Sequence, residues 1–191
     1  ADSLMGGRGP RAPRSILEAN YPAAFPDEIG ETSGRVGIDP YFLLAVMRRE
    51  SLFKPDARSA AGAVGLLQLE PVTARRAATV LGRPALRDEE LTVPATAIDL
   101  GSWYLAELLG RFGDPAVALA AYNAGPRIAL PWATAGVGRP LDEWVEDIPY
   151  RETRRYVKVV AGAWSAYRLL AGGSPPALSP TVPQPRDGAN F

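Results

Sequence analysis

Helical periodicity without strand-like alternation is the feature that most constrains the fold of this chain. Apolar residues recur at spacings of three and four through the middle of the sequence, whereas alternation at every second position is nearly absent. Several helical segments open on an acidic residue followed by proline, as at Asp39–Pro40, Glu70–Pro71 and Asp114–Pro115. An aspartate can cap a helix, and proline suits the first helical turn. The sequence therefore predicts a mainly α-helical fold.

The breaks between the expected helices are marked by proline and glycine. A short helix from residue 15 precedes a break between Pro22 and Pro26, and a second helix follows. Further helices are expected over residues 40–51, from Pro71 to a stop at Gly82, over residues 93–113, from Asp114 to an end at Asn123 or Gly125, and over residues 150–172. The β-structure that this pattern allows is at most a short hairpin near residues 60–70.

The two ends of the chain differ in composition from its middle. Residues 1–14 are rich in Gly, Arg and Pro, and residues 172–191 form a Pro-rich tail without periodicity. We expect both ends to be flexible and residues 15–171 to form one folded domain. No segment approaches the ~20 apolar residues of a membrane span, and the N-terminus lacks the apolar core of a signal peptide. If the protein is exported, its signal has been removed or lies outside these residues.

The composition excludes several kinds of chemistry. The chain has no cysteine and no histidine, which removes disulfides, thiol nucleophiles, the usual Ser-His-Asp triad and most zinc sites. An enzyme with this composition must take its acid and base from Glu, Asp, Tyr or Lys. The 21 basic residues are balanced by 21 acidic ones, so net charge gives no pull toward nucleic acid.

Glu50 is the first candidate functional residue. It continues the apolar stripe of Leu43, Val46 and Met47 at the end of the helix expected over residues 40–51. A carboxylate that pairs with a nearby arginine at a helix end is one interpretation. The other is a general acid, because partial burial and the negative end of the helix dipole would both raise its pKa.

The stretch ARSAAGAVGLLQL, residues 57–69, is the second candidate. Its small residues, with Gly62 and Gly65, let the backbone pass close to another group, and Gln68 places an amide among apolar neighbours. A tight loop that happens to carry a glutamine would look the same.

The stretches LAAYNAGP, residues 119–126, and VEDIPYRETRRYV, residues 145–157, are the third and fourth candidates. The first is typical of a helix end at Asn123 or Gly125, with Tyr122 carrying a hydroxyl to a neighbour. In the second, Glu152 suits the first turn of a helix for electrostatic reasons alone. The neighbouring arginines are most often a solvated face, and the acids among them argue against a nucleic-acid interface.

Taken in order, these motifs resemble the catalytic domain of the large soluble lytic transglycosylases, family-1 enzymes with a goose-lysozyme-like fold. The resemblance covers residues 20–170 and rests on three motifs: the segment from Glu50 to Ala74, "ALAAYNAGP", and "EDIPYRETRRYV". Leu67 stands where the family commonly has Met, and Arg127 follows Pro126 where a second Gly is common. The resemblance implies a lysozyme-like helical domain.

The resemblance also assigns roles residue by residue. Glu50 matches the single catalytic acid of the family. The substrate-binding positions that it implies are Ser59, Gln68, Tyr122, Asn123, Glu152, Tyr156 and Glu146. No cofactor and no metal are implied.

The implied activity is non-hydrolytic cleavage of the MurNAc-β-1,4-GlcNAc bond of peptidoglycan to 1,6-anhydroMurNAc ends. The implied substrate is the peptidoglycan strand and the implied location is the periplasm or cell envelope of a bacterium, with a monomer expected. Two alternatives stay open: a muramidase of the same fold, and a peptidoglycan-binding module without turnover. The large members carry a helical superstructure before this domain that is absent from these 191 residues.

Overall fold

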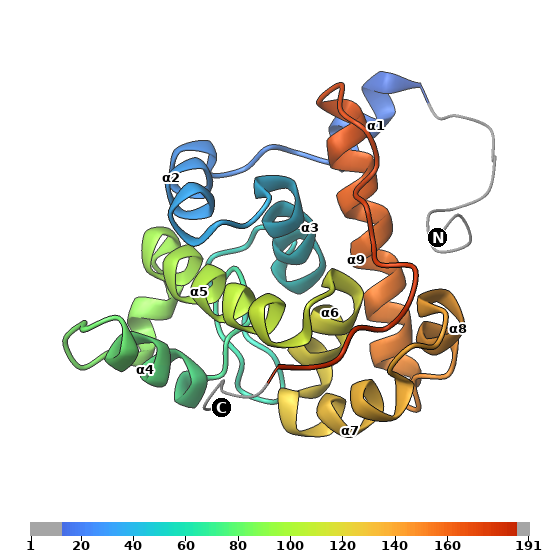
Figure 1. Ribbon diagram of the computed structural model, residues 1–191. Helices are drawn as coiled ribbons and strands as arrows, with labels where there is room; N and C mark the ends of the chain where they lie inside the picture. The colour runs from blue at the N-terminus through green and yellow to red at the C-terminus, as the bar shows by residue number, and fades with distance from the viewer. Residues whose placement is uncertain (1–12, 187–191) are drawn as a thin grey trace. The chain divides into compact units, whose positions relative to one another are not determined.

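The computed structural model describes residues 13–186, which form two compact units (Figure 1). The central unit is Ala23–Ala106, and the terminal unit comprises the described residues up to Pro22 and from Glu107 onward. The boundary falls within one long helix, α5 (Pro94–Phe112). Residues 1–12, most of the N-terminal segment expected to be flexible, lie outside the described residues.

The central unit is built from helices that begin at prolines. It contains α2 (Pro26–Val36), α3 (Pro40–Ser51), α4 (Pro71–Val80), the 3-10 helix η1 (Asp88–Thr92) and most of α5. Helix α2 packs on α3, and α4 packs on η1. Because proline lacks an N–H and has a suitable φ, it costs nothing at the first position of a helix.

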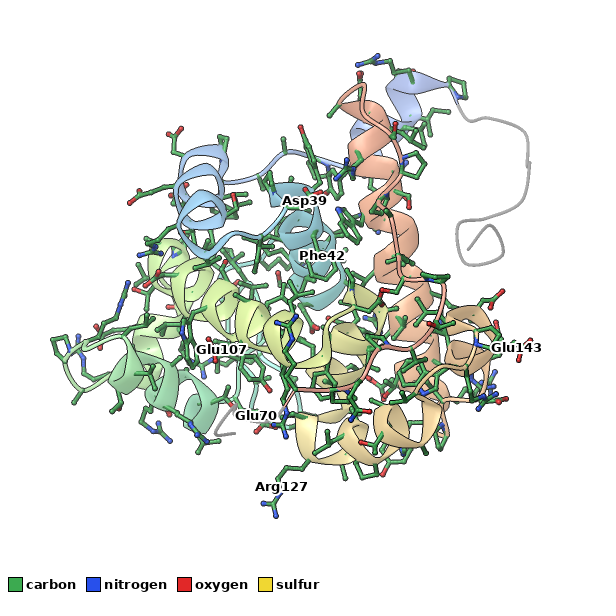
Figure 2. All side chains as sticks on the ribbon, viewed as in Figure 1. Asp39, Phe42, Glu70, Glu107, Arg127 and Glu143 are labelled. Carbon is green, nitrogen blue, oxygen red and sulfur yellow. The ribbon has the colours of Figure 1, made fainter. Side chains whose placement is uncertain are left out.

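Helix α3 is largely buried. Its Asp39 cap accepts a hydrogen bond of 2.8 Å from the N–H of Tyr41, as the sequence predicts. Leu43, Val46 and Met47 are fully buried, so the predicted apolar stripe is confirmed. Figure 2 shows Asp39 at the start of this helix and Phe42 one turn farther along.

A buried carboxylate joins three parts of the central unit. Asp99 on α5 is 5% exposed and forms ion pairs with Arg35 on α2 and Arg83 after α4. A buried carboxylate without partners would be expensive, and two guanidinium groups supply them. This cluster fixes α2 and the end of α4 to α5.

The terminal unit is also helical. It contains α1 (Arg14–Asn20), the end of α5, α6 (Pro115–Ala124), α7 (Pro126–Gly136), α8 (Leu141–Glu146) and α9 (Arg151–Leu170). Helix α9 packs on α6, α1 and α8, and α6 packs on α7. The caps expected at Asp114 and Gly125 are confirmed, because Asp114 accepts from the N–H of Ala116 and Gly125 ends α6.

The C-terminal segment has no helix, as its proline content suggests, but it is bonded to the terminal unit. In Figure 1 it leaves the end of α9 and runs back along that helix. Thr181 forms an antiparallel bridge with Pro140, and Val182 is 1% exposed. We call residues 175–186 the C-terminal strap.

The mainly α-helical prediction is confirmed, with differences in detail. Helices α7, α8 and η1 were not predicted, in part because Pro131 inside α7 resembles a helix break. The described residues hold only isolated bridges, including Arg58 to Val64 and Val64 to Leu69 where the hairpin was expected. Within residues 13–186, no helix combines the length and apolar character needed to cross a membrane.

Candidate active site

Glu50 occupies the last turn of α3, after the buried stretch from Phe42 to Met47. The residue is neither fully buried nor exposed, as expected for a carboxylate that continues an apolar stripe. The chain turns sharply after it, because Leu52 and Phe53 both adopt the left-handed region with φ of 50° and 63°. Residues other than glycine adopt the left-handed region at an energetic cost, so the surrounding packing must enforce this turn.

Ser51 fixes the end of α3 to the loop of residues 57–69. Its buried hydroxyl lies 2.9 Å from the carbonyl oxygen of Leu66 and 3.2 Å from that of Met47, which gives it two acceptors to choose from. The residue after Glu50 is therefore anchored to the loop that carries the next candidate residues.

Gln68 holds this loop from inside. Its Nε2 donates to the carbonyl oxygens of Ala57, at 3.0 Å, and Gly65, at 2.9 Å. Both amide hydrogens are thereby used, and Oε1 remains as an acceptor. Gln68 also has a φ of 46°, so its backbone is held in the left-handed region. The side chain thus has a structural role in addition to any contact with a ligand.

Ser59 lies in the exposed part of the same loop. Its hydroxyl accepts a hydrogen bond of 3.0 Å from the N–H of Ala63, and its own N–H donates to the carbonyl oxygen of Ala63. The hydroxyl hydrogen is left to donate to another group.

The loop needs a residue without a side chain at position 65, which is Gly65. A Cβ built at Gly65 would lie 2.1 Å from the carbonyl oxygen of Leu91, and the residue has a φ of 82°. The close approach of the backbone that the glycine-rich sequence predicts is therefore confirmed, and the partner is the backbone of η1.

In the terminal unit, Tyr122 and Asn123 lie at the end of α6 and are half-buried. Asn123 Oδ1 accepts a hydrogen bond of 2.7 Å from the hydroxyl of Thr153 on α9. This bond joins the AYNAG and ETRRYV motifs, which are 30 residues apart in the sequence.

The candidates on α8 and α9 differ in burial. Tyr156 is 1% exposed and lies one turn after Thr153, whereas Glu152 is exposed in the first turn of α9. Glu146 at the end of α8 is exposed, pairs with Lys158 and accepts a hydrogen bond from Arg154 through its carbonyl oxygen. Glu146 thus has local partners that account for its position.

Two supporting residues were missed by sequence reasoning, Ser51 and Thr153. Each is a small hydroxyl residue inside a helix with no periodic signal of its own, so only the tertiary contact reveals it. In the described part of the chain, no three Asp or Glu side chains gather closely enough to hold a metal ion.

A family model described as "Transglycosylase SLT domain" matches residues 27–137, more than half of the chain. The chain belongs to this family. The match begins in α2 and ends just after α7, so it includes Glu50, the loop with Gln68, and Tyr122 and Asn123.

Curated relatives of this SLT-domain chain include two soluble lytic murein transglycosylases. The one from Escherichia coli K12 is 34% identical over 169 residues, covering 86% of this chain and 26% of the relative. The one from Salmonella typhimurium is 36% identical over 160 residues, covering 82% and 25%. The chain therefore spans about a quarter of the length of these relatives.

Solved structures of the same type resemble the chain in three dimensions. An inactive mutant of the lytic transglycosylase Slt from Pseudomonas aeruginosa matches with a TM-score of 0.78 and 34% identity, covering 87% of this chain and 26% of that one. A complex of the 70-kDa soluble lytic transglycosylase with bulgecin A matches with a TM-score of 0.80 and 32% identity, covering 89% and 28%. These matches confirm the fold inferred from the sequence.

Proposed function

We propose that this SLT domain is a lytic transglycosylase that cleaves the MurNAc-β-1,4-GlcNAc bond of peptidoglycan without water, with Glu50 as acid and then base. Membership of the family and the names of its relatives support the activity. The observation that carries the role of Glu50 is its place in the last turn of α3, anchored through Ser51 to the loop of Gln68.

In the first step, the protonated carboxyl of Glu50 gives its proton to the glycosidic oxygen as the bond from that oxygen to C1 of MurNAc breaks. A retaining glycosidase would ordinarily supply a second carboxylate as nucleophile. The other acids of its sequence motif, Asp56 and Glu70, are exposed, so we assign that part to the acetamido oxygen of the same MurNAc. Its attack on C1 gives a cyclic oxazolinium and releases the GlcNAc end.

In the second step, the ionised Glu50 takes the proton of the MurNAc 6-hydroxyl, and that oxygen attacks C1. The bond from C1 to the acetamido oxygen breaks, so the acetamido group returns to its original form. The product is a 1,6-anhydroMurNAc end, Glu50 regains its proton, and no water is consumed. A single carboxyl group therefore serves as acid and base in turn.

The other candidates would position the sugar. Because both amide hydrogens of Gln68 are held by the carbonyls of Ala57 and Gly65, Gln68 would present Oε1 as an acceptor to a sugar N–H or hydroxyl. Ser59 would donate its free hydroxyl hydrogen. Tyr122 and Asn123 would orient the N-acetyl groups, Glu152 and Glu146 would contact the strand, and the buried Tyr156 would support them from within α9. Fixed contacts of this kind lower the entropic part of the barrier.

The substrate sets the expected location. Peptidoglycan strands lie outside the inner membrane of a bacterium, so we place the protein in the periplasm or cell envelope. The catalytic and substrate-binding residues of this scheme lie in the domain expected over residues 15–171. The scheme needs neither a cofactor nor a second copy of the chain, and we expect a monomer.

Product analysis separates this proposal from the two rivals. The protein would be incubated with purified peptidoglycan in ¹⁸O-labelled water, and the muropeptides analysed by mass spectrometry. A transglycosylase gives unlabelled products lighter by one water than reducing muropeptides. A muramidase gives reducing ends that carry ¹⁸O, and a binding module gives no products while still sedimenting with the polymer.

A further inference from the structure

Asp114 makes contacts that exceed those of an ordinary helix cap. It is 0% exposed, and its Oδ1 accepts a hydrogen bond of 2.7 Å from the N–H of Ala116 in the first turn of α6. Its Oδ2 accepts a second hydrogen bond, of 2.8 Å, from the N–H of Ser179 in the C-terminal strap. One buried carboxylate thus joins the start of α6 to a segment 65 residues later in the chain.

The strap is bonded to the terminal unit along most of its length. Val182 exchanges two backbone hydrogen bonds of 2.9 Å with the loop before α8, accepting from the N–H of Gly138 and donating to Arg139. The N–H of Arg186 donates to the carbonyl oxygen of Arg111 at 2.8 Å. A Cβ at Gly113 would lie 3.3 Å from Pro183, so the strap also packs on the turn before α6.

These contacts are not those of a loosely attached tail. Pro176, Val182 and Pro185 are buried although they belong to a segment without helix. Proline in an extended segment loses little conformational entropy on ordering, so a Pro-rich strap can bind to the terminal unit at a small entropic cost. The buried carboxyl group of Asp114 would lose the N–H donor of Ser179 if the strap left.

Helix α6 is the element that the strap braces. It is only ten residues long, and its other end carries Tyr122 and Asn123. A helix transmits a displacement of its first turn to its last because its backbone hydrogen bonds keep it rigid over such a length. Asn123 in turn bonds to Thr153 on α9, so the far end is fixed to the second motif of the terminal unit.

We propose that Asp114 is a positioning residue that couples the C-terminal strap to α6 and thereby sets Tyr122 and Asn123 for the reaction. This inference rests on the proposed function for the catalytic consequence, but the coupling itself is independent of it. The sequence predicts a flexible tail over residues 172–191. The contacts of Ser179, Val182 and Arg186 lead us to the opposite expectation for residues 175–186.

The test uses variants that remove the coupling in different ways. Asp114→Asn keeps an oxygen to cap α6 but turns an NH₂ group toward Ser179, and Ser179→Pro removes the strap donor while leaving Asp114 intact. Truncation after Ser174 removes the whole strap, whereas truncation after Arg186 removes only residues beyond it. Gln184→Ala, at an exposed strap position, is the matched control.

We expect the three disruptive variants to fold and to lose turnover. Asp114→Asn, Ser179→Pro and the truncation after Ser174 should each lower kcat on soluble glycan strands about tenfold or more, with KM within about threefold. The double variant Asp114→Asn/Ser179→Pro should be no worse than the more impaired single variant, because both remove one interaction. Hydrogen exchange should rise in residues 115–124, while the Arg186 truncation and Gln184→Ala stay like wild type.

Two results would overturn the proposal. One is wild-type kcat and wild-type exchange of α6 in the folded single variants. The other is a loss of activity that is additive in the double variant and disappears on cooling, which would mark a general loss of stability. If the truncation after Ser174 does not fold, the single variants still decide. If the wild-type protein cleaves no peptidoglycan, the proposed function fails, and hydrogen exchange of α6 alone tests the coupling.

Discussion

Asn123 on α6 and Thr153 on α9 are joined by a hydrogen bond of 2.7 Å between the amide oxygen and the threonine hydroxyl. Thr153 is 1% exposed, so water cannot easily replace it as a partner. Asn123 is a proposed substrate-binding residue, and Thr153 fixes the direction of its amide.

Replacing Thr153 by Val keeps the shape of the side chain but removes this bond. We expect Thr153→Val to lower the free energy of unfolding by about 1–2 kcal/mol and to reduce turnover, because the Asn123 amide is free to rotate. Urea denaturation measures the free energy of unfolding, and the rate at which muropeptides form from peptidoglycan measures turnover. Thr153→Ser, which retains the hydroxyl, should stay closer to wild type in both, and equal losses in the two variants would contradict the role of the bond.

Gln68 should not tolerate a carboxylate. Gln68→Glu replaces two donors by acceptors that face the carbonyl oxygens of Ala57 and Gly65. We expect it to lower the free energy of unfolding by about 1–3 kcal/mol and to abolish most turnover at neutral pH. Gln68→Ala removes the bonds without adding charge and should be the milder change in stability. A Gln68→Glu protein as stable and active as wild type would show that the loop does not depend on these donors.

Gly65 and Gly62 form a matched pair for testing the close approach of the loop backbone. Both have positive φ, at 82° and 88°, but only a Cβ at Gly65 meets another atom within 4 Å, the carbonyl of Leu91. Alanine at Gly62 should therefore cost about 1 kcal/mol from backbone conformation alone. Alanine at Gly65 should cost several times more, as measured by thermal or urea unfolding. Equal costs would refute the predicted contact with Leu91.

Because Tyr104 on α5 is buried, we expect the protein to lose stability at alkaline pH. Burial, with a smaller effect of the charge on Glu70, raises its pKa from 10.0 to about 12. Between these values the unfolded chain releases the phenol proton and the folded protein retains it, so the free energy of unfolding falls as pH rises. This difference between the two pKa values corresponds to at most about 2.7 kcal/mol in the free energy of unfolding.

The Tyr104 contribution is measured by denaturation between pH 9 and 12, compared with Tyr104→Phe. The wild-type protein should lose stability more steeply than the variant over this range, and its absorbance titration should contain a late phenol that is missing from Tyr104→Phe. Parallel pH profiles for the two proteins would contradict the raised pKa.

Local sequence signals predicted the helix starts well, because capping depends on neighbours in the chain. Asp39 and Asp114 cap the helices that their Asp-Pro pairs predict. Helix α7 was missed because Pro131 lies within it. A proline reads as a break in sequence, but a helix stabilised by tertiary packing can accommodate one.

The candidate site was accessible to sequence reasoning only in part. The resemblance supplied the positions of Glu50, Gln68 and Tyr122 because their motifs are continuous segments. The supporting residues Ser51 and Thr153 act through bonds to Leu66 and Asn123, which lie 15 and 30 positions away in the chain. The strap could not be anticipated, because its Pro-rich sequence is the same whether it is bound or free.

The role of Glu50 as the catalytic acid is tested most directly by comparing Glu50→Gln with Glu31→Gln on purified peptidoglycan. Glu31 is an exposed residue on α2 in the same unit and controls for the loss of one carboxylate. Both proteins should show the wild-type circular dichroism spectrum and a cooperative melting transition. We expect anhydro-muropeptides from wild type and Glu31→Gln and almost none from Glu50→Gln. Wild-type release of anhydro-muropeptides by a folded Glu50→Gln protein would contradict this expectation.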